Sequence, residues 1–392
     1  MVMKKALLLS LFAASYVHSA CDESVKVESN DDLGSVVSCS KFKGDITIKN
    51  TPIAGINFGG LSEVDGSIFI ENNKDLNNIY LSGLEKITGQ LFVGNNTKLS
   101  VLNVDKLSEV KEFRAINNPN MGEVTFHNIS SIETIQIIQT SVSNLGIVSA
   151  ESLKNIEITS NKKLDSIGFP NLTETSGYVL FADNGKNGKV SLPELAKING
   201  NCSFSDLSEL DIGKLKSVGS DFTISANSFK NITIRTLEKT GKAVTISENS
   251  ALENITFPNL TDIGGSLNIQ NNTKMTYLYP DSFPKLKSIS GSIVLIGPFD
   301  NASFTAISHM DGSLSMKSTG DINCDGFKKN VSSYIKNANK VTCKGNVKNN
   351  SSKKGDKKDS DGSSDDSDSG ANPVQFLGLV STFALVAGTF LF

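Results

Sequence analysis

Apolar and polar residues alternate in short bursts along most of this chain, and the bursts return at a regular interval. In the clearest copies, an apolar residue at position i is followed by a second at i+2 and an asparagine at i+5, as in Ile68, Ile70 and Asn73. Alternation over three to five residues is the period of a β-strand, not of a helix. Thirteen copies fit between Thr51 and Thr319, which gives a mean period of about 22 residues.

This period predicts the fold class. A repeat of this length is typical of a solenoid, in which each repeat buries its apolar face only against its neighbours. A second alternation follows in each copy, as at Ile79 and Leu81, so we expect at least two short strands per coil. The sequence therefore predicts an all-β protein, a right-handed parallel β-solenoid over residues 45–320 with short helical caps. Thirteen stacked strands would form a rod on the order of 60 Å long.

The asparagine of each copy has a predicted structural role. An inward amide can donate and accept hydrogen bonds at a corner whose main-chain groups would otherwise be unpaired. We predict a buried ladder of Asn73, Asn96, Asn118, Asn161, Asn184, Asn227, Asn249 and Asn272. The weaker copies place Thr51, Thr140, Leu207, Pro298 and Thr319 at this position. Glycine recurs before the first strand, where we expect corners with positive φ at Gly66, Gly89, Gly177, Gly200 and Gly265.

Cysteines bracket the repeats. Cys21 and Cys39 precede them, and Cys324 and Cys343 follow them at a similar spacing. We predict one disulfide at each end, as expected of a secreted protein, and each would contribute roughly 3 kcal/mol in the chain-entropy model. The fifth cysteine, Cys202, stands at position i of a weak copy. We expect a buried thiol that packs as a small apolar side chain, with a reactive or intermolecular cysteine as the alternative.

Each cysteine pair encloses a predicted helix, and so we assign an N-terminal cap to residues 21–44 and a C-terminal cap to residues 321–344. The N-terminal helix is indicated by a capping sequence before three apolar residues, namely Asn30, Asp31 and Asp32 before Leu33, Val36 and Val37. The C-terminal helix is indicated by the helical spacing of Phe327, Val331, Tyr334 and Ile335.

Both ends of the chain carry processing signals. Residues 1–20 carry two lysines, Lys4 and Lys5, near the start, continue as a short apolar run and end in small residues, which is typical of a signal peptide. Residues 345–370 are rich in Ser, Asp and Lys and predict a disordered stalk. Residues 371–392 end in an apolar tail and predict a GPI-attachment propeptide. The predicted attachment residue is Ser369 or Gly370, with Ser363 or Ser364 and an ordinary membrane span as alternatives.

Sequons for N-glycosylation are dense. They begin at Asn95, Asn128, Asn171, Asn201, Asn231, Asn254, Asn259, Asn271, Asn301, Asn330, Asn349 and Asn350. Behind a signal peptide, they predict a heavily glycosylated surface. Together with the lipid anchor, they predict a chain on the extracellular face of the plasma membrane and in the cell wall.

Four features of this chain occur together in a known protein family. They are the repeat L-x-x-[IV]-x-G-x-[IL]-x-[IV]-x-x-N-x-x-L, the flanking cysteine pairs, the Ser-rich stalk and the terminal tail. Together they resemble the fungal GPI-anchored cell-wall-organisation and sporulation-specific proteins, whose repeats are related to the receptor L-domain and to leucine-rich repeats. The resemblance covers residues 1–392. It implies a non-enzymatic surface glycoprotein that acts in wall organisation, with wall polysaccharide or other surface proteins as partners and the membrane bound through the GPI lipid. It supplies no catalytic residue and no cofactor.

The outward position i+1 of the first strand is where a solenoid enzyme would gather its carboxylates. The predicted row is Thr47, Phe69, Phe92, Arg114, Gln136, Glu157, Leu180, Ser203, Thr223, Thr245, Asn268, Val294 and Ser315. Its single carboxylate is Glu157, and Arg114 could reach it only across Gln136. Phe69 and Phe92 form an aromatic pair that either meets a partner or stabilises the sheet.

Candidate catalytic and metal-binding residues are sparse. His127 and His309 lie far apart in the sequence, too far in a rod to share a metal or a catalytic triad. A formal net charge of −3 gives no reason to expect a nucleic-acid partner. We therefore expect no enzyme, no metal and no cofactor. The alternatives are a glycosidase or transglycosidase that remodels wall polysaccharide, and an adhesin-like surface protein that binds a ligand.

Overall fold

The computed structural model describes residues 21–126, 128–146, 148–332 and 340–345. Within them the chain is a parallel β-solenoid of about 13 turns with two short helices, which confirms the predicted fold class. The predicted signal peptide, the stalk beyond Gly345 with the attachment residues Ser369 and Gly370, and the propeptide all lie outside the described residues. So do His127, Asn349 and Asn350.

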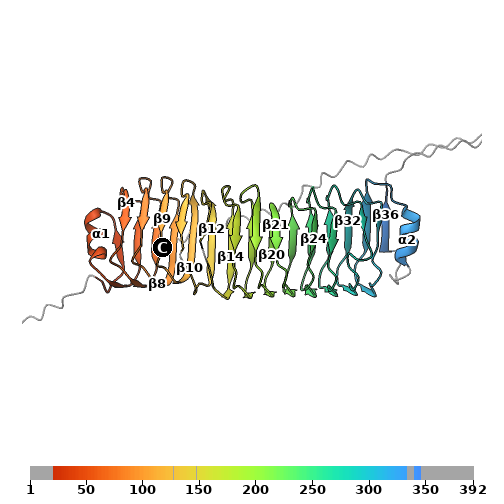
Figure 1. Ribbon diagram of the computed structural model, residues 1–392, viewed down its shortest axis with the longest axis horizontal. Helices are drawn as coiled ribbons and strands as arrows, with labels where there is room; N and C mark the ends of the chain where they lie inside the picture. The colour runs from red at the N-terminus through yellow and green to blue at the C-terminus, as the bar shows by residue number, and fades with distance from the viewer. Residues whose placement is uncertain (1–20, 127, 147, 333–339, 346–392) are drawn as a thin grey trace, which may run out of the picture. The chain divides into compact units, whose positions relative to one another are not determined.

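Each coil contributes one strand to a main column that runs the length of the solenoid (Figure 1). Neighbouring strands of this column pair in parallel, from β1 with β3 to β35 with β36. The strands are β1 (Val25–Val27), β3 (Ile46–Lys49), β6 (Ile68–Glu71), β8 (Lys86–Gly94), β10 (Glu109–Asn118), β12 (Thr134–Thr140), β14 (Asn155–Thr159), β17 (Val179–Ala182), β20 (Cys202–Ser205), β23 (Phe222–Ser225), β26 (Val244–Ser247), β29 (Leu267–Gln270), β32 (Ile293–Gly297), β35 (Leu314–Ser318) and β36 (Val341–Lys344).

A second column follows the asparagine corner and holds the second alternation of each repeat. It is split into four short parallel sheets. They comprise β4 (Gly55–Asn57), β7 (Asn78–Tyr80), β9 (Val101–Asn103) and β11 (Glu123–Thr125), then β15 (Ser166–Gly168), β18 (Gly188–Ser191) and β21 (Leu207–Asp211), then β24 (Asn231–Thr233) and β27 (Asn254–Thr256), and finally β30 (Tyr277–Leu278) and β33 (Asn301–Ala302).

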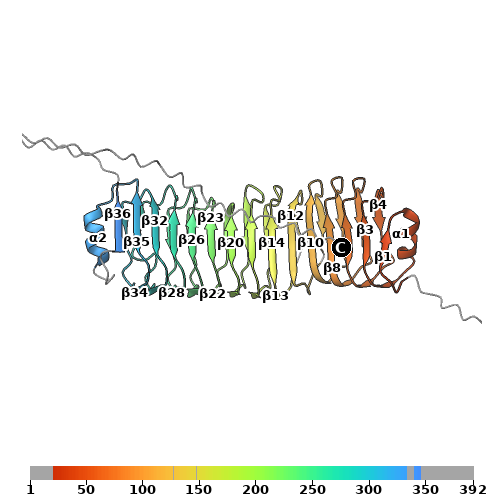
Figure 2. The same ribbon diagram turned by 180° about the vertical axis from the view of Figure 1, so that it is seen from behind.

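A third column of very short strands precedes the main one, and its strands line one edge in Figure 2. The N-terminal coils supply β2 (Lys41–Lys43) and β5 (Glu63–Asp65), which continue into the first residues of β8 and β10. An eight-stranded sheet covers the remaining coils: β13 (Ser152–Leu153), β16 (Glu174–Thr175), β19 (Lys197–Ile198), β22 (Ser217–Val218), β25 (Lys239–Thr240), β28 (Asp262–Ile263), β31 (Ser288–Ile289) and β34 (His309–Met310).

The core is one continuous apolar cluster enclosed by the three columns. The residues at i and i+2 point inward, and Ile68 and Ile70, for example, have no exposed surface. Phenylalanine rings from successive coils contact one another along the C-terminal half, with centroids 6.0 Å apart for Phe181 and Phe204 and 5.3 Å apart for Phe257 and Phe283. Because the cluster is shared between coils, each coil depends on its neighbours for burial.

The eight predicted asparagines are all buried and form a directed ladder. Each amide reaches back to the preceding coil. Asn96 Nδ2 donates to the carbonyl of Ile70 at 3.0 Å, and Asn96 Oδ1 accepts from the backbone N–H of Asn73 at 3.0 Å. Asn118 repeats both contacts against the coil of Asn96. The ladder therefore pairs main-chain groups that the corner turns inward, where water cannot reach them.

The ladder consists of three runs, and each begins at a coil without asparagine. Thr51, Thr140 and Leu207 have no amide side chain, yet their backbone N–H groups donate to the asparagine of the next coil at 2.9, 3.0 and 2.8 Å. The last run ends at Asn272, before Pro298. Because proline has no backbone N–H, the corner at Pro298 needs no acceptor from the coil of Thr319.

The residue before the ladder position has a left-handed backbone in most coils, a feature that the repeat pattern did not predict. Eleven coils share this feature, with φ between 55° and 61°. The residues are Asn50, Asn72, Asn95, Asn117, Gln139, Ser160, Asp183, Asp206, Ala226, Glu248 and Asn271. Asn and Asp tolerate this conformation better than most residues, which explains their frequency here.

The glycines before the first strand have a different role from the one predicted. Only Gly66 of the five has a positive φ, so the expectation is wrong for Gly89, Gly177, Gly200 and Gly265. A Cβ on Gly200 would lie 2.4 Å from the carbonyl oxygen of Gly177 in the coil before. These glycines are needed because the backbones of successive coils approach too closely for a side chain.

The two helices cover the ends of the solenoid (Figure 1). Helix α1 (Asn30–Val37) is capped by Ser29, one residue before the predicted capping sequence, and the Ser29 N–H donates to the Asp32 carboxylate at 2.9 Å. Helix α2 (Cys324–Ser332) buries Phe327 and Val331, whereas Tyr334 and Ile335 lie outside the described residues.

Disulfides close both caps. One joins Cys21 to Cys39 and the other joins Cys324 to Cys343. The caps also add β1 and β36 to the main column, so the sheet extends beyond residues 45–320 at both ends.

The ladder predicts a large cost for Asn161→Leu. The Asn161 amide oxygen accepts from the Thr140 N–H, and its Nδ2 donates to the Ile137 carbonyl at 2.8 Å. Leucine would leave both buried main-chain groups unpaired, so the free energy of unfolding should fall by roughly 1–3 kcal/mol. Denaturant unfolding measures the change. Lys163→Gln, at an exposed position of the same coil, is the control, and equal curves for the two variants would refute the ladder.

The close approach of coils predicts that Gly200→Ala destabilises the protein, by roughly 1–3 kcal/mol, because the new methyl group meets backbone that cannot rotate away. Gly122→Ala is the matched control, since its nearest heavy atom would be the Ser141 carbonyl oxygen at 3.9 Å. Thermal melting of both variants tests this, and a cost for Gly122→Ala as large as that for Gly200→Ala would contradict it.

Candidate binding face

The outward row of the main column is continuous. Register partners connect Thr47 with Phe69, Phe69 with Phe92, and each later member with the next as far as Ser315. All thirteen predicted residues are half-buried and share one face. Because neighbouring strands lie about 4.8 Å apart, this face repeats at that interval along the solenoid. We call it the main face.

The far end of the Phe92 ring lies over a neighbouring residue of its own strand. A Cβ on Gly94, two residues later on the same side of β8, would lie 2.6 Å from Cζ and 2.7 Å from Cε1 of the Phe92 ring. The ring therefore covers the bare backbone of Gly94, an arrangement that stabilises a strand glycine. Phe69 is its register partner on β6. The pair thus presents aromatic surface beside solvent, while the ring of Phe92 is fixed in orientation.

Polar side chains continue the row directly beyond Phe92. Arg114 pairs with Glu112 on its own strand at 2.8 Å, and not with Glu157. Gln136 Nε2 donates to Glu157 Oε2 at 2.7 Å, and the Tyr178 hydroxyl donates to the same oxygen at 3.1 Å. These planar groups span four neighbouring coils. They form a fixed set of hydrogen-bonding groups next to an aromatic surface, which is how binding sites combine affinity with orientation.

The environment of Tyr178 alters its acidity. Burial of the phenol raises the pKa of Tyr178 to about 12, and the neighbouring Glu157 carboxylate acts in the same direction. The hydroxyl therefore stays protonated and remains a hydrogen-bond donor at any pH a cell surface meets.

Beyond Leu180 the character of the main face changes. Its row continues with small polar side chains, among them Ser203, Thr223, Thr245 and Asn268. The aromatic and charged groups are thus confined to the N-terminal half of the row.

Glycosylation sequons avoid the main face almost completely. Of those on described residues, only Asn201 lies on it, directly before β20. Asn95 and Asn271 lie at left-handed corners, and Asn231, Asn254 and Asn301 lie in the second column. Asn128, Asn171 and Asn259 follow second-column strands, and Asn330 is in α2. These asparagines therefore lie off the outward row itself, and Asn95, directly after Gly94, is the one nearest to its stretch from Phe69 to Tyr178.

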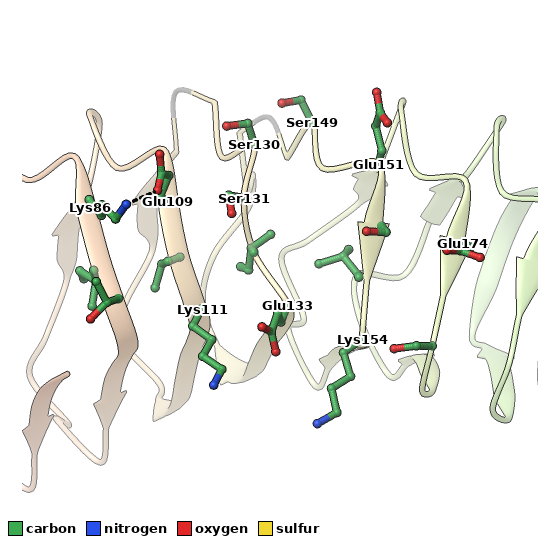
Figure 3. Close-up of a pocket in the computed structure, with 17 residues that line it drawn as sticks. Lys86, Glu109, Lys111, Ser130, Ser131, Glu133, Ser149, Glu151, Lys154 and Glu174 are labelled. Atoms are coloured by element: carbon green, nitrogen blue, oxygen red, sulfur yellow. Dashed lines mark ion pairs between the residues drawn. The ribbon is translucent and has the colours of Figure 1, made fainter. Parts of the chain in front are cut away.

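A groove of about 920 Å³ lies at the third-column edge, where the ladder between β10 and β13 is interrupted. An isolated bridge between Glu109 and Ser131 stands in place of a paired strand. Lys86 pairs with Glu109 at 2.9 Å. Figure 3 shows that the other charged groups, such as Glu133, Glu151 and Glu174, are spread along the groove rather than gathered at one point. Serine hydroxyls make up much of its remaining polar lining.

The remaining candidates for chemistry are isolated. Over the described ranges, no group of three or more His, Cys, Asp or Glu residues could hold a metal ion. His309 lies 3.2 Å from Asp311 at an exposed site. Cys202 is a free, buried thiol, and its burial raises the pKa of that thiol. No helix among the residues described is long and apolar enough to cross a membrane.

Comparison with known proteins gives the context for this face. The chain is 27% identical over 334 residues to "Protein ecm33" of Aspergillus fumigatus, a match that covers 84% of the chain and 83% of the relative. It is 27% identical over 346 residues to "Cell surface GPI-anchored protein" of Arthroderma benhamiae, covering 88% of both. Fungal Ecm33 and GPI-anchored surface proteins are homologues of this chain.

A further relative is "Sporulation-specific protein 2" of Saccharomyces cerevisiae, 28% identical over 295 residues, or 74% of the chain and 57% of that protein. These relatives confirm the resemblance drawn from the repeat and the cysteine pairs. No protein-family model matches the chain, and no solved structure matches it.

The sequence pattern predicted the outward row of the main face, but not all of the residues that contact it. The i+1 rule placed Phe69, Phe92 and Glu157 on one face. It missed Tyr178, which precedes its strand by one residue, and Gly94, whose bare backbone orients Phe92. The signal for Gly94 was present, because it is an outward glycine two residues after an outward aromatic residue.

The raised pKa of Tyr178 predicts a pH effect on stability. The phenol is favoured in its protonated form in the folded state, so its contribution to stability is complete below pH 10 and is lost as the pH rises towards about 12. Tyr178→Phe should therefore reduce the alkaline fall in stability and remove from the absorbance titration a tyrosine that ionises at about pH 12. Tyr80→Phe, at an exposed tyrosine, is the control. An identical titration for wild type and Tyr178→Phe would contradict the assignment.

Proposed function

We propose that this chain is a GPI-anchored glycoprotein of the fungal cell surface that organises the wall without catalysis, and that its main face binds a linear wall polysaccharide. The name "Cell surface GPI-anchored protein" supports the surface location, and the name of a further relative, "Cell wall protein ecm33" of Schizosaccharomyces pombe, supports a role in the cell wall. The observation that carries the binding proposal is the fixed, outward ring of Phe92 beside Arg114, Gln136 and Glu157 on a face almost free of sequons.

The chemistry of the face fits a sugar polymer. Pyranose rings have apolar C–H faces that lie against an aromatic ring, and hydroxyl rims that exchange hydrogen bonds with planar polar groups. The main face offers the ring at one end and amide, carboxylate, guanidinium and phenol groups along its length. Its repeat of one residue per coil suits an extended polymer of identical units better than it suits a compact ligand.

The same contacts favour binding over hydrolysis. A glycosidase needs two carboxyl groups on opposite sides of the bond it cleaves. Here the Glu157 carboxylate accepts from Gln136 and Tyr178, while Glu112 pairs with Arg114. An enzyme on this face would have to break these pairs before it could use either carboxylate. This supports the proposal that the chain holds polymer without cutting it.

The test is co-sedimentation of the secreted chain, residues 21–345, with insoluble β-glucan and with chitin. Wild type should bind one of the two polymers, and Phe92→Ser should weaken binding about tenfold, the equivalent of about 1.4 kcal/mol. Thr245→Ala, at the same row position in the C-terminal half, should bind like wild type. Melting curves identify any variant that is unfolded.

Two results would overturn the proposal. Release of oligosaccharides from either polymer would show catalysis. Failure of the folded wild type to bind either polymer would remove the polysaccharide as the ligand and favour the adhesin-like alternative, in which the partner is another surface protein.

A further inference from the structure

Two exposed tyrosines interrupt a row of glycosylation sequons in the second column. Tyr277 and Tyr279 keep 42% and 46% of their surface accessible, and both point outward from the coil of β30. Their rings stack on each other with centroids 5.6 Å apart and planes 23° from parallel. A stacked pair of this size is an apolar patch that a secreted protein would rarely leave bare to water.

The coils on either side carry sequons at the same positions. The pattern is outward Asn, buried apolar residue, outward Thr or Ser, as in Asn254, Ile255 and Thr256. The coil of Tyr277 and Tyr279 has the same alternation, with tyrosine in place of both polar residues. In the following coil the pattern returns at Asn301, Ala302 and Ser303.

Asn301 is the immediate neighbour of the tyrosine pair. It is the register partner of Tyr277 in the parallel ladder of β30 and β33. The Ser303 N–H donates to the Leu278 carbonyl at 2.9 Å, which fixes that register. Neighbouring strands lie about 4.8 Å apart, so a sugar attached to Asn301 Nδ2 begins within reach of both rings.

The Asn301 amide is also available for a sugar. Within the part of the chain that the structure describes, its side chain makes no hydrogen bond. Asn254, by contrast, donates through Nδ2 to Asn231 Oδ1 at 2.9 Å, and Asn259 donates through Nδ2 to the Arg235 carbonyl at 2.7 Å. A glycan on Asn301 therefore displaces no existing contact of that amide.

We propose that the N-linked glycan of Asn301 packs its first N-acetylglucosamine units against the stacked rings of Tyr277 and Tyr279. The apolar face of the sugar covers the exposed rings, and the rings in turn hold the glycan along the second column. This intramolecular contact orients one glycan of the sequon row. It requires only that the chain is secreted and glycosylated, and does not depend on polysaccharide binding by the main face.

The first test measures how accessible the glycan is. The full-length chain, purified in detergent, is treated in its folded state with a peptide N-glycosidase, and release at each asparagine is followed by mass spectrometry of the peptides. Release at Asn301 should be several-fold slower than at Asn254 in wild type. The difference should disappear in the double variant Tyr277→Ser, Tyr279→Ser.

Tyr80→Ser is the matched control. Tyr80 is an exposed tyrosine of the same column, but its register partners Asn57 and Asn103 begin no sequon. This variant should release the Asn301 glycan as slowly as wild type. Equal rates at Asn301 and Asn254 in wild type, or an Asn301 that carries no glycan, would overturn the proposal.

The second test reads the contact from the tyrosine side. Nitration of Tyr277 and Tyr279 by tetranitromethane should rise several-fold in Asn301→Gln, while nitration of Tyr80 stays constant. Unchanged nitration of the pair would also overturn the proposal. Phe92→Ser should leave both readouts unchanged, so a failure here and a failure of polysaccharide binding are distinguishable.

Discussion

Wherever the next coil carries a ladder asparagine, the corner before it depends on hydrogen bonds to that side chain. An inward-turning corner leaves a backbone N–H and a carbonyl group in the apolar interior, where unpaired groups cost one to several kcal/mol. The asparagine of the following coil meets both needs with one side chain, as Asn96 does for Asn73 and Ile70. An aspartate carboxylate could not donate a hydrogen bond to the carbonyl group, and a threonine has a single hydroxyl where asparagine has separate donor and acceptor groups. This requirement explains why one residue type recurs at one position over most of the chain.

The opposite corner is constrained by space rather than by hydrogen bonding. At Gly200 the backbone of one coil almost touches that of the coil before, and similar approaches recur at Gly219, Gly241 and Gly264. Glycine on one side and asparagine on the other thus fix both the distance and the alignment between coils. The outward residues between them are free of either constraint. This freedom allows the main face to carry Phe92 and Arg114 in one half and small polar residues in the other.

The features that recur in every repeat could be predicted from the sequence, whereas features that depend on single side chains could not. The alternation at Ile68 and Ile70 marks a strand because a buried sheet face requires it, and the period then gives the solenoid. Third-column strands such as β22, only two residues long, have no alternation to detect. The left-handed corners could not be predicted, because residues as different as Ala226, Glu248 and Asn occupy them and so leave no common sequence signal. On the main face, the row was predictable from register. The orientation of Phe92 and the hydrogen bonds of Tyr178 depend on individual side-chain contacts that periodicity does not specify.

The backward reach of the asparagines also gives the molecule an order of assembly. A ribosome makes the coils from the N-terminus, and a newly made asparagine coil cannot complete its corner until the asparagine of the next coil has emerged. Folding must then trail synthesis by about one repeat, with a fresh unpaired edge always at the growing tip. The run that ends at Asn272 meets Pro298, whose nitrogen has no hydrogen to satisfy. The corner at Pro298 therefore does not have to wait for an acceptor from the coil that follows it.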